Sequence, residues 1–356
     1  MKHKAIDGDR ARFGIIGGGN ADYERADLVA VCDVLEEKLE PFREQGIPVY
    51  TDHLEMLDKA PMDMVIVRTP THLHVPMATA ALERGIHVYG EKPMAVTAQE
   101  LKAFLKVCEA SSGHYRCGLE LRHSAVPRRV KEICEQHVGE PVHAFWHIRD
   151  FSKAHPNTRF RPWKYLKSHT GGHAVEEMCH FIDLLRFWMD DDVARLCTCA
   201  SPIITRWFEG IHDNMTISLW FRRGSAGSVY CSQTGSPVMT YDAGVVGREG
   251  AVFWDMIKES KHTERVVVAD HVLDDDGMVV EQTVQVVEDY SSLGATKCHH
   301  DVPGYIQQFI DCLLGLDEPV QDYLDAAETF KACLAAEASA ELGGVVLDPG
   351  EWFESV

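Results

Sequence analysis

The sequence lacks long hydrophobic runs. The longest unbroken apolar stretch in its 356 residues is five, at Leu28–Cys32 and again at 332–336, whereas a helix needs about 20 apolar residues to span a bilayer. Basic residues occur near the N-terminus, but the apolar core of a secretory signal does not follow them. We therefore expect a cytoplasmic protein that has no membrane partner.

The chain is also short of positive charge and of cysteine. It has 35 Lys and Arg against 55 Asp and Glu, a formal net charge of −20 at pH 7. This acidic excess repels phosphate backbones, which argues against nucleic acid as a partner. Eleven cysteines at irregular spacing are too few for a disulfide scaffold, so we expect reduced thiols.

The length of the chain exceeds the roughly 100–200 residues of one domain and predicts two. The first third alternates short apolar runs with amphipathic stretches. This pattern predicts strands at Arg12–Ile16, Leu28–Cys32, Met64–Val67 and His87–Tyr89, and helices at Pro76–Arg84 and Ala98–Ala110. Such alternation is typical of parallel βαβ units.

After about residue 122 the pattern changes to longer strands with a period of two. We expect strands around Val142–Ile148, Met215–Phe221, Gly227–Thr234, Thr263–Ala269 and Met278–Val287. These strands suggest one large, mostly antiparallel sheet. The chain then becomes helical, with an apolar stripe from Tyr305 to Leu314 and an Ala-rich stretch at Asp325–Leu342.

A glycine turn follows the first predicted strand. Gly17-Gly18-Gly19-Asn20 supplies the first two glycines of a G-x-G-x-x-G turn, although Asp22 holds the third position. Glycines suit such a turn because backbone N–H groups must approach a pyrophosphate closely. Asp33 ends the second strand, where a carboxylate can accept hydrogen bonds from an adenosine ribose and disfavour a 2′-phosphate.

Further motifs occur along the chain. They are Thr-Pro-x-x-x-His at Thr69–His74, Ala81–Val88, Glu91-Lys92-Pro93, Gly171–Arg186, Gly247–Gly250 and the stretch from Asp325 to Val345. Together they resemble the glucose–fructose oxidoreductase / inositol dehydrogenase / MocA (Gfo/Idh/MocA) family of NAD(P)-dependent oxidoreductases, over nearly the whole chain.

The resemblance implies an α/β protein with a doubly wound Rossmann domain at 10–122. An α/β domain with a large, mostly antiparallel open sheet would follow at 123–356, its last helices partly packing back on the first domain. It also implies a homo-oligomer, a dimer or tetramer, and a nicotinamide cofactor, which the carboxylate of Asp33 predicts to be NAD rather than NADP. The implied cofactor-binding residues are Gly17, Gly19, Asn20, Asp33, Thr69, Pro70, Thr71, His74, Glu91 and Lys92.

The same resemblance suggests the catalytic residues Lys92, His180 and Glu176. A lysine at the end of a parallel strand can stabilise developing alkoxide character on a reacting hydroxyl. A histidine can accept the alcohol proton, and Glu176, one helical turn earlier, can orient the ring or contact a hydroxyl.

The expected substrate is a sugar, a glycoside or a cyclitol. Its predicted contacts are Arg122, Arg161, Trp163, Tyr165 and His180, because aromatic faces beside charged donors suit polyols. Alternatives remain open: glycoside cleavage through transient NAD-dependent oxidation and elimination, or a non-catalytic protein with a degraded cofactor site. A metal-assisted isomerase or lyase using His173, Glu176 or Glu177 and His180 is less favoured, so we predict no metal.

The connection after the glycine turn is unusually short. Asp33 lies 16 positions after Gly17 (33 − 17 = 16), whereas the fingerprint expects about 20 with a helix between. Either the natural chain lacks this helix, or residues of the natural chain are missing from the sequence. We favour the second explanation, because Asp33 and the later motifs survive. A mass near 39.9 kDa for the intact protein would overturn it.

Overall fold

The computed structural model describes residues 5–19, 22–149, 162–202, 211–212, 214–232, 239–258, 262–273, 279–291 and 300–356. Contacts divide the chain into two compact units. The first comprises residues 1–120 and 302–330, and the second comprises residues 121–301 and 331–356. This division assigns 302–330 to the first unit, whereas the expected domain ranges place that segment within 123–356.

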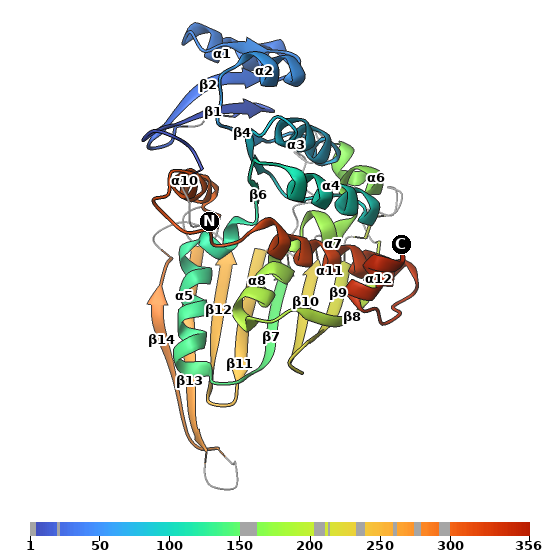
Figure 1. Cartoon of the computed structure of the whole chain (residues 1–356). Helices are drawn as coiled ribbons and strands as arrows, with labels where there is room; N and C mark the ends of the chain where they lie inside the picture. Colours follow the sequence, from blue (N-terminus) through green and yellow to red (C-terminus); the bar gives the residue numbers. More distant parts are fainter. Residues whose placement is uncertain are drawn as a thin grey trace. The chain divides into compact units, whose positions relative to one another are not determined.

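The first unit is built on a parallel sheet of six strands in the order β3-β2-β1-β4-β5-β6 (Figure 1). The strands are β1 (Ala11–Ile16), β2 (Ala26–Cys32), β3 (Val49–Tyr50), β4 (Met64–Val67), β5 (His87–Gly90) and β6 (Tyr115–Cys117). The intervening helices are α1 (Glu36–Glu44), α2 (His53–Lys59), η1 (Thr71–Leu73), α3 (His74–Leu82) and α4 (Ala98–Ala110). The predicted doubly wound sheet is confirmed, and α4 has the predicted bounds.

The connection from β1 to β2 is nine residues long, from 17 to 25. The chain pairs the two strands in parallel with the residues present, from Ala11 opposite Ala26 to Ile16 opposite Cys32. One face of this sheet packs against α10 (Val302–Leu313), which lies much later in the sequence. Phe309 and Ile310 of α10 pack in one buried cluster with Phe13 of β1.

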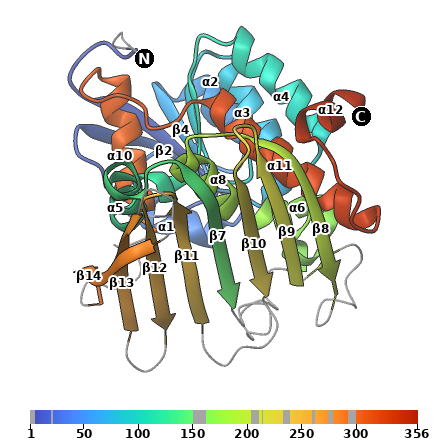
Figure 2. The same cartoon turned by 90° about the horizontal axis from the view of Figure 1, so that it is seen from below.

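The second unit is built on an eight-stranded sheet in the order β14-β13-β12-β11-β7-β10-β9-β8 (Figure 2). Its strands are β7 (Pro141–Arg149), β8 (Val193–Ser201), β9 (Asn214–Phe221), β10 (Ala226–Ser232), β11 (Met239–Gly247), β12 (Gly250–Lys258), β13 (His262–Leu273) and β14 (Val279–Asp289). All neighbouring pairs are antiparallel except β7 and β10. The predicted mostly antiparallel sheet is therefore confirmed. The sequence patterns did not predict β8, β11 and β12.

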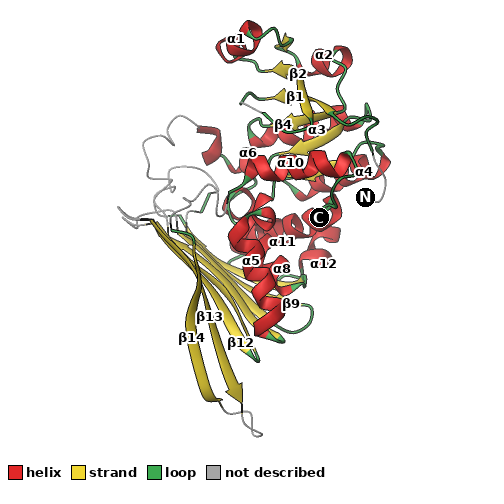
Figure 3. Ribbon diagram, turned by 90° about the vertical axis from the view of Figure 1, so that its left-hand side faces the viewer, coloured by secondary structure: helices red, strands yellow, loops and turns green. Residues whose placement is uncertain are grey.

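Helices of the second unit lie along one face of this sheet (Figure 3). The helical segments that lie wholly or partly in this unit are η2 (Glu120–His123), α5 (Ala125–Ile133), η3 (Cys134–Val138), η6 (Pro162–Tyr165), α6 (Lys167–Thr170), α7 (His173–Glu176), α8 (Cys179–Met189), α11 (Tyr323–Glu341) and α12 (Pro349–Ser355), of which α11 belongs to it from residue 331 onward. Trp146 of β7 is buried against Trp188 of α8 and Trp254 of β12, with ring centroids 5.8 and 4.9 Å away. The period of two predicted for β7 thus places Ala144, Trp146 and Ile148 in the buried core, whereas Val142 near the start of the strand is exposed.

Within the described ranges, no helix has both the length and the apolar composition that crossing a membrane requires. The ten cysteines in these ranges are free thiols.

Candidate functional site

The carboxyl ends of the parallel strands bring the predicted cofactor residues to one edge of the first unit. Gly17–Gly19 follow β1, Asp33 follows β2, Thr69 follows β4, and Glu91-Lys92 follow β5. The ladders align these ends, because Ile16 pairs with Val67 and Val67 pairs with Gly90. Ligands of doubly wound sheets bind at this edge, where the strand order reverses.

The glycine turn requires glycine for conformational and steric reasons. Gly17, Gly18 and Gly19 have φ values of +101°, +74° and +106°, a region that residues with a Cβ avoid. A Cβ on Gly17 would lie 2.3 Å from the carbonyl oxygen of Arg68. The turn therefore runs directly against the loop after β4, and a side chain larger than that of glycine does not fit at Gly17. Asn20 lies outside the described residues.

Asp33 is buried at the end of β2. One of its carboxylate oxygens accepts a hydrogen bond from the backbone N–H of Leu35 at 3.0 Å, and the other is 3.3 Å from Nζ of Lys38. A Cβ on Gly18 would lie 3.1 Å from that second oxygen. The carboxylate is thus held beside the glycine turn, where the fingerprint places the group that binds the adenosine ribose.

The loop after β4 is tied to the loop after β5 by His74. This buried ring lies with Nε2 2.9 Å from the carbonyl oxygen of Thr69 and with Nδ1 3.1 Å from the carbonyl oxygen of Pro93. His74 therefore positions both loops, and Pro70 and Thr71 lead into the first turn beyond β4. Among the described residues, the buried hydroxyl of Thr69 has no hydrogen-bond partner, which leaves it available to a ligand.

Glu91 and Lys92 place opposite charges at the end of β5. Burial raises the pKa of Glu91 to about 7, and the neighbouring Glu120 carboxylate acts in the same direction, whereas the cations of Arg68 and Lys92 oppose the rise. Lys92 is half-buried, and the Lys92–Pro93 peptide bond is cis. The edge therefore holds a cation next to a carboxyl group that titrates near neutral pH.

Replacement of Glu91 by glutamine is expected to change how stability depends on pH. The folded pKa of about 7 exceeds the unfolded value of 4.5, so the folded chain binds more protons between these limits and the free energy of unfolding falls as pH rises through them. The free energy of unfolding of the variant minus that of the wild type should therefore rise by about 1 kcal/mol or more between the two pKa values. Above the folded pKa it should level off. Scanning calorimetry from pH 5 to pH 8 measures it.

The control for this prediction is Glu109→Gln, because Glu109 is an exposed residue of α4 in the same unit. A stability difference for Glu91→Gln that stays flat over the same pH range would contradict the assignment.

In the second unit, His180 and Glu176 are both buried on neighbouring helices. Glu176 ends α7, and His180 lies in the first turn of α8. The His180 ring is edge-to-face with the ring of His300 at 5.8 Å, and the Glu176 carboxylate is 3.4 Å from Nζ of Lys164. A small pocket beside Glu176 is lined by Lys164, Thr170, Gly172, His173 and Ile211.

Glu337 of α11 holds this region in place, a role that the sequence patterns missed. It accepts a hydrogen bond from the backbone N–H of Ala174 at 2.7 Å, and Lys167 lies 3.2 Å away. A Cβ on Gly172, where φ is +109°, would lie 2.2 Å from the Glu337 carboxyl carbon. Gly172 is therefore required by a carboxylate 165 positions later (337 − 172 = 165), which no local pattern indicates.

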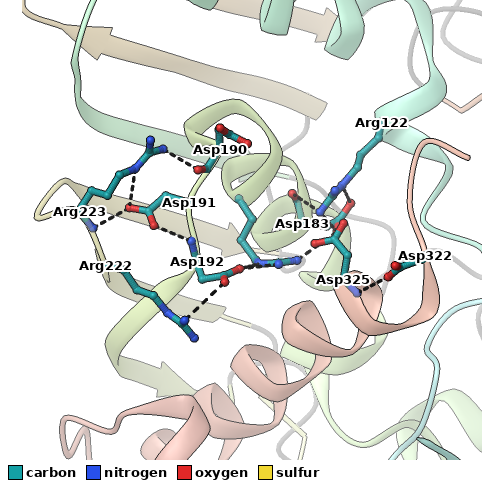
Figure 4. A network of polar contacts seen from close by, with 10 residues as sticks. Arg122, Asp183, Asp190, Asp191, Asp192, Arg222, Arg223, Asp322 and Asp325 are labelled. Atoms are coloured by element: carbon teal, nitrogen blue, oxygen red, sulfur yellow. Dashed lines mark hydrogen bonds and ion pairs between the residues drawn. The ribbon is translucent and has the colours of Figure 1, made fainter. Parts of the chain in front are cut away.

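Arg122 pairs with Asp183 in the interior of the second unit (Figure 4). Its Nε and Nη2 donate to the two carboxylate oxygens, each at 2.7 Å, and the side chains are 6% and 1% exposed. The guanidinium also lies over the ring of Phe187 at 5.4 Å. In the structure, this predicted substrate contact joins η2 to α8 through a bidentate buried pair.

The remaining predicted substrate residues lie on or before η6. Trp163 is half-buried, with Nζ of Lys164 5.8 Å from its ring centroid. Arg161 lies outside the described residues, and so does the side chain of Tyr165. Lys164, which contacts both Trp163 and Glu176, is the residue of this segment that the sequence analysis did not single out.

The structure does not support the metal alternative. Across the described ranges, no group of three or more His, Cys, Asp or Glu residues is placed to hold a metal ion. The His173 ring instead has Nε2 3.2 Å from Sγ of Cys231, and Glu176 faces Lys164.

A parallel doubly wound sheet with a glycine turn after the first strand and an acidic residue after the second is typical of a dinucleotide-binding domain. The chain belongs to the Gfo/Idh/MocA family of oxidoreductases. Residues 11–118 match the family's NAD-binding Rossmann fold, and residues 128–253 match its C-terminal domain. These matches confirm the family that the sequence motifs resemble. They also confirm the predicted enzyme class, an oxidoreductase, and a nicotinamide cofactor.

Named relatives extend this similarity along almost the whole chain. The scyllo-inositol 2-dehydrogenase (NAD(+)) of Bacillus subtilis is 25% identical over 349 residues, which cover 94% of this chain and 95% of the relative. The myo-inositol 2-dehydrogenase of Thermotoga maritima is 24% identical over 70% of this chain and 76% of its own length. A crystal structure of myo-inositol 2-dehydrogenase from Lactobacillus plantarum has the same fold, with a TM-score of 0.76 and 22% identity over 95% of this chain and 99% of that one.

Proposed function

We propose that this protein is an NAD-dependent dehydrogenase that acts on a hydroxyl carbon of a cyclitol, a sugar or a glycoside. The observation that carries the proposal is the meeting of Gly17–Gly19, Asp33, Thr69 and Lys92 at one edge of the parallel sheet. The names of its relatives, which are dehydrogenases of scyllo- and myo-inositol, support a polyol as the substrate.

The residues at the sheet edge fit a nicotinamide dinucleotide. The glycine turn has the positive φ values and tight backbone packing of a dinucleotide-binding turn, and the buried Thr69 hydroxyl has no hydrogen-bond partner among the described residues. Asp33 would accept hydrogen bonds from the ribose hydroxyls, and its charge favours NAD over NADP. When bound, the nicotinamide supplies the acceptor or donor of a hydride.

On the substrate side, Lys92 would hold the reacting hydroxyl and stabilise negative charge that develops on its oxygen. His180 would accept the hydroxyl proton through its imidazole. Glu176 and Lys164, which are 3.4 Å apart, would offer an acceptor and a donor to the other hydroxyls, and Trp163 would present an apolar face to the ring. An oligomer of this chain, a dimer or tetramer, is part of the same proposal.

The proposed function is tested with the purified chain, NAD and a panel of inositols, monosaccharides and glycosides. We expect absorbance of reduced nicotinamide to rise with at least one polyol. Binding of NADH, followed by its fluorescence, tests the cofactor site separately. A chain that binds no NADH and turns over no polyol would instead be a non-catalytic member of the family. Release of an aglycone without net NADH would indicate the glycoside-cleaving alternative.

Replacement of His180 by asparagine is expected to lower kcat by about 10²-fold, because the variant has no imidazole to accept the hydroxyl proton. The wild-type rate should fall at acidic pH, where a protonated imidazole cannot act as base, and this dependence should be lost in the variant. Steady-state kinetics across pH measures both effects. His137→Asn, at an exposed position in the same unit, is the control, and an unchanged pH profile in His180→Asn would contradict the role.

A further inference from the structure

The short connection between β1 and β2 alters how a diphosphate can be bound. In the usual dinucleotide fold, the glycine turn opens a helix whose N-terminus faces the diphosphate. Here only nine residues separate the two strands. In the described part of this connection, residues 17–19 and 22–25, the chain forms no helix. These residues therefore do not present the positive end of a helix dipole to a diphosphate.

Arg68 brings a cation to the same place. It directly follows β4, and its backbone N–H donates to the carbonyl oxygen of Ile16 at 2.8 Å. Its own carbonyl oxygen lies against Gly17, and its Nη1 lies 3.2 Å from the position that a Cβ on Gly19 would occupy. The guanidinium therefore lies beside the glycine turn, on the edge where the cofactor residues meet.

The short connection itself anchors this guanidinium. Nη2 of Arg68 donates to the hydroxyl of Tyr23 at 3.0 Å. Tyr23 is buried, and its ring packs edge-to-face on Phe13 at 5.5 Å. On the other side, Nε is 3.9 Å from a carboxylate oxygen of Glu91, too far for a hydrogen bond. Among the described residues, Nη1 has no hydrogen-bond acceptor, so its two N–H groups remain available next to Gly19.

We propose that the Arg68 guanidinium neutralises and binds the diphosphate of the nicotinamide cofactor beside the glycine turn, whose described residues form no helix. The inference rests on the proposed function, because it requires that cofactor. A planar guanidinium can donate two parallel hydrogen bonds to phosphate oxygens, and Tyr23 orients it in advance. Lys38 lies on the other side of the turn, with Cδ 3.7 Å from a Cβ on Gly18, but its ammonium faces Asp33.

Three variants of the full chain distinguish the role of the Arg68 charge from that of the Tyr23 hydroxyl that anchors it. Arg68→Met removes the cation, Arg68→Lys keeps a point charge, and Tyr23→Phe removes the anchoring hydroxyl while the cation stays. The Kd for NADH is measured by its fluorescence, and the Kd for ADP-ribose is measured by calorimetry. ADP-ribose has the diphosphate but lacks the nicotinamide. Melting temperatures are recorded for every variant.

We expect Arg68→Met to weaken NADH and ADP-ribose alike, by about 10- to 100-fold, the value of a charge-assisted hydrogen-bond set. Arg68→Lys should recover part of the loss, and Tyr23→Phe should stay within about threefold of wild type. Exposed Arg43→Met, on α1 of the same unit, should leave both Kd values unchanged.

Three results would overturn the inference. Unchanged binding of both ligands in Arg68→Met shows that the guanidinium does not contact the diphosphate. If all three variants lose the same amount of affinity and the same amount of melting temperature as one another, Arg68 acts only by holding Tyr23 in place. Failure of the wild-type chain to bind NADH or ADP-ribose contradicts the proposed function itself, which distinguishes that failure from the first two.

Discussion

Replacement of Lys92 by methionine is expected to lower kcat by about 10³-fold, while the Kd for NADH changes by less than about tenfold. Lys92 is half-buried where β5 ends, and methionine keeps most of its length and apolar contact while removing the ammonium. The charge is needed most when the substrate oxygen becomes negative, so its removal should affect the chemical step more than binding. Single-turnover kinetics with saturating NAD measures that step.

Two further variants make the result specific to this lysine. Lys92→Arg keeps a cation with a different shape, and it should retain more activity than Lys92→Met but less than wild type. Lys106→Met, at an exposed position of α4, should behave as wild type. A loss of less than about tenfold in Lys92→Met, with NADH binding and melting temperature retained, would exclude Lys92 from catalysis.

Breaking the buried pair of Arg122 and Asp183 is expected to destabilise the second unit by about 3–5 kcal/mol. The reason is that either single variant, Arg122→Met or Asp183→Asn, leaves a buried charge without its bidentate partner. All seven tryptophans lie between 146 and 352 and outside 302–330. Urea unfolding followed by tryptophan fluorescence therefore reports on this unit without a contribution from the first.

A double variant and a matched surface pair complete this experiment. Arg122→Met combined with Asp183→Asn removes both charges, so its cost should be smaller than the sum of the two single costs. Arg248→Met breaks the exposed pair with Glu140, which is 2.8 Å long with side chains 70% and 68% exposed, and should cost less than about 1 kcal/mol. If the two single variants near Asp183 cost no more than Arg248→Met, the pair does not stabilise the unit.

Much of the first unit could be predicted because its signals are local. The apolar runs of β1, β2, β4 and β5 and the helix at Ala98–Ala110 follow from periods of two and 3.6 residues. The motifs around Lys92 and His180 are likewise contiguous in sequence. The predicted strands of the second unit were found for the same reason, whereas β8, β11 and β12 did not stand out from the sequence pattern.

The partners of these residues could not be predicted in the same way. Arg122 was expected to contact substrate, but its guanidinium is paired with Asp183, 61 positions later (183 − 122 = 61). The need for glycine at position 172 comes from the Glu337 carboxylate that packs against it. The apolar face of β1 is covered by α10, which is likewise too distant in sequence for any local pattern to indicate. Arg68 directly precedes the Thr69–His74 motif, and no local pattern indicated that its guanidinium would lie beside Gly19.

The amino-acid sequence by itself determined the fold class of each part, the family and the positions of the motif residues, because periodicity, turn chemistry and short motifs are properties of neighbouring residues. Only the tertiary structure decided which buried charges pair, which helix covers the first strand, and which cation lies beside the glycine turn. Those outcomes depend on packing between segments far apart in the chain, and the free energy of burying a charge or an apolar face depends on the partner that the fold brings to it.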